Sequence, residues 1–131
     1  MYLLDTHILL WWVGGAYRFS SAVQKIFDKT SPEQPLLLSV ISLWEIAMLK
    51  ALGRIELHLP VREWLEIASA PPLIQCQTIT PAIAAEVAQL PREFQRDPAD
   101  RLIVATGRVV GATVITLDQR ICDSKLVSTI S

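Results

Sequence analysis

Four acidic side chains stand where the sequence predicts that a strand leads into a helix: Asp5, Glu45, Asp100 and Asp118. Converging carboxylates repel one another, and such a group is tolerated only when pKa values rise or a cation binds. Carboxylate oxygens are preferred ligands of Mg²⁺ and Mn²⁺, whereas zinc favours cysteine and histidine clusters, which this sequence lacks. The four acids therefore predict a Mg²⁺ or Mn²⁺ site.

Each of these acids also has a structural explanation that needs no metal. Glu45 could close a capping box with the serine three residues before it. Asp97 caps a predicted helix, and Asp100 would then lie in its first turn, where the helix dipole favours an acid. Asp5 and Asp118 could each cap a turn or a short helix. Only their joint placement favours the metal site.

Short apolar runs alternate with longer segments of helical period, which is typical of strand-helix units around a parallel sheet. The predicted strands cover 2–4, 36–40, 73–78 and 113–116, and an apolar run at 126–130 could add an edge strand. Predicted helices cover about 20–28, 42–51, 60–69, 82–89 and 97–110, with serine, threonine, proline and glycine at their ends. We expect one domain over residues 1–131, a three-layer α/β/α sandwich with a central parallel sheet of four to five strands. Function gathers at the carboxyl ends of strands in such sheets.

The composition excludes several classes of protein. The net charge is -1 and 51% of the 131 residues are hydrophobic, so no global basic field attracts nucleic acid. Some of the apolar surface is expected to meet a partner. The segment from Leu36 to Leu52 is too short and too charged to cross a bilayer. No basic stretch precedes the first apolar run, which indicates a cytoplasmic protein without a signal peptide.

Several other side chains carry expectations about packing. Cys76 and Cys122 form no metal or redox spacing and are predicted to be small buried hydrophobes. Trp44 is predicted to pack in the core. His7 follows Asp5 closely enough to line the acidic site, where packing or hydrogen bonding is favoured over a role as ligand.

Four ordered motifs resemble PIN domains of the VapC type, the toxin ribonucleases of bacterial toxin-antitoxin pairs. They are Asp5-Thr6-His7, Trp44-Glu45-Ile46, Asp97-Pro98-Ala99-Asp100-Arg101-Leu102-Ile103 and Thr116-Leu117-Asp118, and together they span almost the whole chain. The resemblance implies a Mg²⁺- or Mn²⁺-dependent endoribonuclease that leaves 5′-phosphate and 3′-hydroxyl ends. It also implies a homodimer and a cognate antitoxin that covers the acidic pocket.

The resemblance assigns roles to individual residues. Asp5 and Asp100 would be the direct metal ligands, and Glu45 and Asp118 would complete the cage. Thr6 and Thr116 match hydroxyls that hold the acids or a water. A bound cation would lower the pKa of water and neutralise charge on the phosphodiester.

RNA contacts are expected from a few local side chains. Lys50 and Arg54 could reach the phosphate backbone beside the acids. Arg101 could do so as well, but pairing with a neighbouring carboxylate is favoured. Trp11 and Trp12 are adjacent, so a helix directs them to different sides, and an exposed indole there could stack on RNA or contact a partner.

Three alternatives belong to other functional classes. A response-regulator receiver would need paired acids after the first strand and a late lysine, but Asp5 stands alone and Asp118 takes the place of that lysine. A haloacid-dehalogenase-type phosphatase would need an aspartate where His7 stands. A module that only binds RNA or a partner would not need four intact acids.

Overall fold

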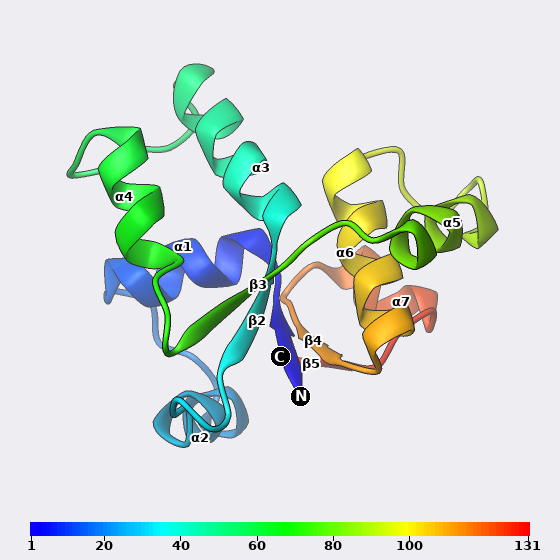
Figure 1. The fold of residues 1–131 in the computed structure, drawn as a ribbon, viewed down its shortest axis with the longest axis horizontal. Coiled ribbons are helices and arrows are strands. Elements are labelled where there is room, and N and C mark those ends of the chain that lie inside the picture. Colours follow the sequence, from blue (N-terminus) through cyan, green and yellow to red (C-terminus); the bar gives the residue numbers. More distant parts are fainter.

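The computed structural model describes residues 1–131 and contains one five-stranded sheet (Figure 1). Its strands are β1 (Tyr2–Leu4), β2 (Leu36–Ser39), β3 (Ile74–Gln77), β4 (Thr113–Ile115) and β5 (Thr129–Ile130). They lie in the order β3-β2-β1-β4-β5, and every neighbouring pair is parallel. Because β2 and β4 flank β1 on opposite sides, the order reverses at β1, and such a switch point leaves a crevice at the carboxyl ends of the strands.

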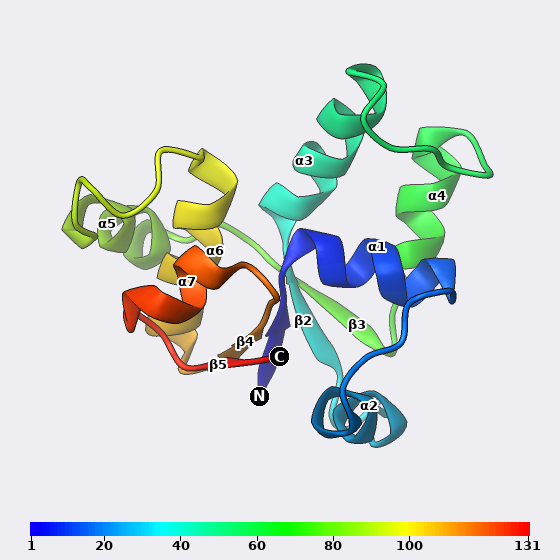
Figure 2. The same cartoon turned by 180° about the vertical axis from the view of Figure 1, so that it is seen from behind.

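Seven helices cover both faces of this sheet. They are α1 (Thr6–Gly14), α2 (Ser21–Asp28), α3 (Val40–Ala51), α4 (Val61–Ala68), α5 (Pro81–Gln89), α6 (Pro98–Val110) and α7 (Gln119–Ser124). Figures 1 and 2 show α1, α2 and α4 on one side of the sheet and α5, α6 and α7 on the other. The predicted three-layer α/β/α class with a parallel sheet is confirmed.

The alternating side chains of the strands divide the core between the two faces. Leu4 and Leu38 belong to the cluster that packs with α1 to α4. Leu3 and Leu37 face the other way, and Leu3 packs with Ile103 of α6. Burial on both faces explains why β1 and β2 appear in the sequence as continuous apolar runs.

Local capping signals place most helix ends where the sequence predicts them. The Ser20 hydroxyl accepts a hydrogen bond from Val23 N at 3.2 Å and begins α2. Thr80 caps α5, and Asp97 caps α6. Gly111 ends α6 with a φ of 71°, the left-handed conformation that glycine adopts at low cost.

The start of α3 corrects one prediction. Its cap is Ser39, whose hydroxyl accepts from Ile41 N at 3.3 Å, so the helix begins at Val40 and not at Ser42. Glu45 therefore lies in the second turn. The predicted capping box between Ser42 and Glu45, which would have explained Glu45 without a metal, is therefore wrong.

Two packing predictions are also wrong. Trp44 is 51% exposed and lies on the outer side of α3. Cys76 is exposed because it lies on the edge strand β3, while Cys122 is half-buried. None of the helices combines the length and apolar character that crossing a membrane requires.

Candidate metal centre

All four predicted acids line one pocket of about 420 Å³ at the carboxyl ends of the strands. The complete lining is Asp5, His7, Trp11, Glu45, Asp97, Asp100, Leu117, Asp118 and Arg120. These residues come from α1 and α6 with their N-caps, from α3, from the segment that joins β4 to α7, and from α7 itself. The pocket is therefore the crevice that the strand order predicts.

Asp5 is the most enclosed of these acids, with an exposed fraction of 5%. It follows β1 directly and caps α1, because its Oδ1 accepts from Thr6 N at 2.8 Å. Its Oδ2 accepts from the Thr116 hydroxyl at 2.7 Å. Burial raises the pKa of Asp5, and the hydrogen bonds from Thr116 and Thr6 oppose that rise without cancelling it.

Thr116 connects the acids of two neighbouring strands. Besides donating to Asp5, its oxygen accepts from Asp118 N at 3.0 Å. Asp118 Oδ1 in turn accepts from Arg120 N at 2.9 Å and caps α7. The Thr6 and Ser42 hydroxyls lie 2.8 Å apart in the buried base of the site. Both threonines thus hold the acidic residues or the elements that carry them.

Glu45 and Asp100 reach the pocket from two helices in opposite layers. Burial raises the pKa of Glu45; the Thr6 hydroxyl lowers it, and Asp97 and Asp5 raise it further. The pKa of Asp100 rises to about 7 because the carboxyl is partly buried and because Asp5, Asp97, Asp118 and Glu45 repel its negative charge. The pocket therefore resists full ionisation at neutral pH unless a cation compensates it.

Asp97 is the acidic residue whose place in the site was missed. It does cap α6, since its Oδ1 accepts from Ala99 N at 2.8 Å. Its carboxylate also lies with those of Glu45 and Asp100, and one oxygen of each falls within 4.8 Å of the others. The spacing of Asp97 and Asp100 indicated this, because residues three apart share one side of a helix.

Arg101 does not pair with a carboxylate as predicted. Its guanidinium instead donates to four backbone carbonyls at 3.1–3.3 Å, those of Val87, Leu90, Pro91 and Gln95. This leaves little donor capacity for RNA. Arg101 fixes the segment between α5 and α6, which leads into Asp97.

The basic residue on the pocket wall is Arg120, which sequence reasoning missed. Its Nε lies 3.8 Å from Asp118 Oδ1, and its side chain is 76% exposed. Lys50 and Arg54 do not line the pocket, and Lys50 pairs with Glu56 at 3.9 Å. Arg120 lies two residues beyond Asp118 in α7. The sequence did not predict this helix, and therefore did not place Arg120 at the rim of the pocket.

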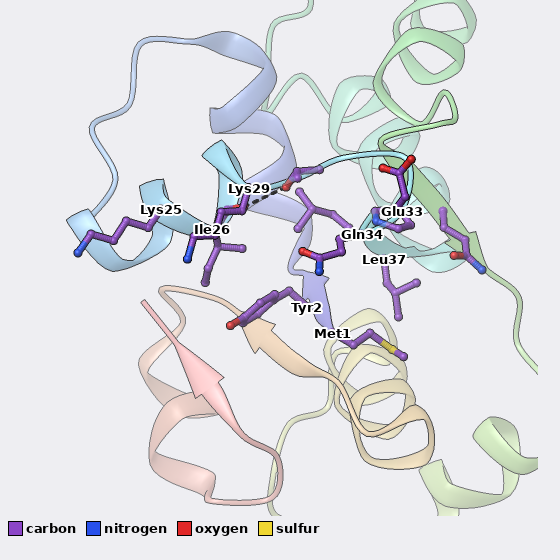
Figure 3. Close-up of a pocket in the computed structure, with 12 residues that line it drawn as sticks. Met1, Tyr2, Lys25, Ile26, Lys29, Glu33, Gln34 and Leu37 are labelled. Carbon is purple, nitrogen blue, oxygen red and sulfur yellow. Dashed lines mark hydrogen bonds between the residues drawn. The ribbon is translucent and has the colours of Figure 1, made fainter.

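A larger cavity, of about 570 Å³, lies at the opposite ends of the strands and is not the acidic site. Figure 3 shows that its labelled residues come from the start of β1, from α2 and from the segment around β2. Glu33 is the one acid that lines it, beside Lys25 and Lys29. Of these two cavities, the smaller one holds the cluster of acids that could bind a cation.

Comparison with known proteins agrees with this geometry. The family model described as the PIN domain matches residues 2–125. Ribonuclease VapC22 of Mycobacterium tuberculosis is 36% identical over 119 residues, which cover 91% of this chain and 88% of that protein.

Two solved structures share the fold at low identity. One is VapBC2 from Rickettsia felis bound to a DNA fragment of its promoter, with a TM-score of 0.72, 13% identity, and 98% and 96% of the two chains covered. The other is FitAcB from Neisseria gonorrhoeae, with a TM-score of 0.69, 21% identity, and 100% and 97% covered.

Proposed function

Because the chain belongs to the PIN-domain family, we propose that it is a divalent-cation-dependent endoribonuclease and the toxin of a toxin-antitoxin pair. The relative that is 36% identical to it is named a ribonuclease. The observation that carries the proposal is the convergence of five carboxylates, those of Asp5, Glu45, Asp97, Asp100 and Asp118, in one pocket.

The donor set suits Mg²⁺ or Mn²⁺, because it consists of carboxylate oxygens without a cysteine. Asp5 and Asp100 are the proposed direct ligands, with Glu45 and Asp118 completing the cage. Asp97 lies close enough to Glu45 and Asp100 to join them. When bound, the cation supplies water of lowered pKa as nucleophile and neutralises charge that develops on the phosphodiester.

The chain's own hydrogen bonds prepare this cage before any ion arrives. Each oxygen of Asp5 accepts one hydrogen bond, from Thr6 N or from the Thr116 hydroxyl, and retains a lone pair for a ligand. Thr116 also fixes the backbone of Asp118. We propose that Arg120, at the rim, receives the phosphate of the RNA, and that Lys50 and Arg54 contact the backbone further from the cut.

The proposed antitoxin has an apolar surface available beside the acids. Trp44 and Met48 of α3 and its C-cap Leu52 recur every four residues and are 51%, 39% and 60% exposed. This stripe begins next to Glu45 and is the proposed seat of an antitoxin segment that covers the pocket. A homodimer in the cytoplasm completes the proposal.

Cleavage of a panel of structured and single-stranded RNAs tests the function. Purified protein is expected to cleave with Mg²⁺ or Mn²⁺, and EDTA or Asp5→Ala should abolish cleavage. Glu33→Ala is the control, because Glu33 lies at the other end of the sheet. Cation binding without cleavage above the Asp5→Ala background would instead indicate a module that only holds RNA or a partner.

A further inference from the structure

One wall of the acidic pocket is aromatic, which a cation site does not require. His7 and Trp11 are four residues apart on α1, so they share one side of the helix. Their ring centroids lie 5.8 Å apart with a tilt of 48°. Both side chains line the pocket together with the acids.

Tyr17 packs against the indole ring of Trp11. The two rings are stacked, with centroids 4.7 Å apart and planes 15° apart. This contact covers the side of the indole that Tyr17 meets. Trp11 is half-buried and lines the pocket, so part of its side chain borders the same space as the acids.

The neighbouring Trp12 has the same kind of stacking partner but a different location. Its ring stacks on Phe27 of the core at 4.7 Å and 16°, and both Trp11 and Trp12 pack against the core on that face of the sheet. Trp12 does not line the pocket. Trp11 packs against the same core, so what distinguishes it from Trp12 is that it also lines the acidic pocket.

The remaining lining indicates what that ring would contact. Among the nine lining residues, only Trp11 and Leu117 are apolar, and Arg120 of α7 lies at the rim. An apolar side chain from a protein partner would be placed among carboxylates, which is unfavourable. A nucleobase combines an aromatic face with polar edges, and its phosphate suits Arg120 and a bound cation.

We propose that Trp11, held by Tyr17 and flanked by His7, is a stacking platform for an unpaired RNA base next to the scissile phosphodiester. This inference rests on the proposed function and specifies its substrate. A base inside a duplex has both faces covered by its neighbours, so the platform selects RNA that is single-stranded at the cut.

An abasic scan tests the contact on both molecules at once. An RNA that the wild type cleaves is synthesised with one base removed at a time around the cut, and kcat/KM is measured for each. At one position, loss of the base is expected to lower the wild-type value by on the order of 10- to 100-fold. Trp11→Leu should lower cleavage of the intact RNA similarly and should make cleavage indifferent to that base.

Trp12→Leu is the matched control, since it removes the adjacent indole and its stacked contact but leaves the pocket lining intact. It should retain the full dependence on the base. Trp11→Phe keeps an aromatic face and should restore most of the activity that Trp11→Leu loses. Circular dichroism and the thermal midpoint establish that each variant is folded.

Three outcomes overturn the inference, and a fourth overturns the proposed function on which it rests. Equal sensitivity to the abasic site in wild type and Trp11→Leu, or no sensitive position in the wild type, would remove the stacking platform. Unchanged RNA cleavage by Trp11→Leu with lost affinity for the antitoxin would assign the ring to a protein partner. Failure of the wild type to cleave or bind any RNA would refute the proposed function itself.

Discussion

The raised pKa of Asp100 is the most direct indication that the pocket would bind a cation. This pKa is raised to about 7, first by burial and then by repulsion from Asp5, Asp97, Asp118 and Glu45. The pKa values of Asp5 and Glu45 are also raised, chiefly by burial. The metal-free pocket therefore holds protons more tightly than the same side chains do in the unfolded chain.

This predicts how the stability of the metal-free protein depends on pH. A carboxyl group with a raised pKa binds more protons when folded, so stability falls as pH rises from about 4 to beyond 7. In EDTA, the thermal midpoint should be lower at pH 8 than at pH 5, by on the order of 5 °C. Asp100→Asn should lessen that fall and also abolish cleavage, whereas Glu33→Gln should change neither. An equal or higher midpoint at pH 8 would contradict the prediction.

Thr116 gives a second prediction, which separates positioning from charge. Thr116→Val keeps the shape but removes the donor to Asp5 and the acceptor for Asp118 N. Mn²⁺ affinity, measured by calorimetric titration, should fall about 10- to 100-fold. Thr129→Val on β5, outside the pocket lining, should bind Mn²⁺ normally. Equal Mn²⁺ affinity of Thr116→Val and wild type would show that Thr116 does not position the acids.

The sequence predicts the four acids of the site from local patterns at the starts of helices. Only Asp5 and Asp118 lie between a strand and the helix that follows it, whereas Glu45 lies in the second turn of α3, and Asp100 lies in a helix that follows α5 and not a strand. Asp97 was assigned only as a cap, although one carboxylate both caps the helix and joins the cluster. Arg101 could not be predicted correctly, because its partners are backbone carbonyls, three of them in the irregular segment after α5 and one in the last turn of α5. No residue type or spacing marks such acceptors in a sequence.

At the scale of elements, the segment between α5 and α6 depends on one side chain. Arg101 satisfies three of its backbone carbonyls and that of Val87 in α5, and thereby holds the approach to Asp97. Arg101→Lys should lower the free energy of unfolding by about 2–4 kcal/mol, because one ammonium cannot reach four fixed acceptors. Urea unfolding measures this loss. Arg92→Lys, an exposed change in the same segment, should be nearly neutral, and a similarly small loss for Arg101→Lys would refute the anchoring role.

The boundaries of elements were predictable where a cap or a left-handed glycine marks them, as at Ser20, Thr80 and Gly111. The boundary between β2 and α3 was not predictable. Apolar residues stand on both sides of Ser39, the cap of α3, and a single serine between them does not mark the switch from strand to helix. The six-residue helix α7 is too short to show a helical period.

At the scale of the whole molecule, the exposed apolar side chains predict self-association. Sedimentation velocity of the purified chain should give the mass of two 14.6 kDa protomers at micromolar concentration. In the complex with the co-expressed antitoxin, the stripe of Trp44, Met48 and Leu52 should be shielded from solvent. Trp44→Glu should weaken that complex without changing the mass of the toxin alone. A toxin that sediments as one protomer at tens of micromolar would refute the dimer.

The order of the strands bears on when activity can first arise. β1 ends at Leu4, but its partner β4 begins only at Thr113, and Asp5 depends on the hydroxyl of Thr116. During synthesis, the ribosome makes the central strand long before the strand that completes its sheet. We therefore expect the acidic cluster of the nuclease to be complete only after β4 has been made, late in translation.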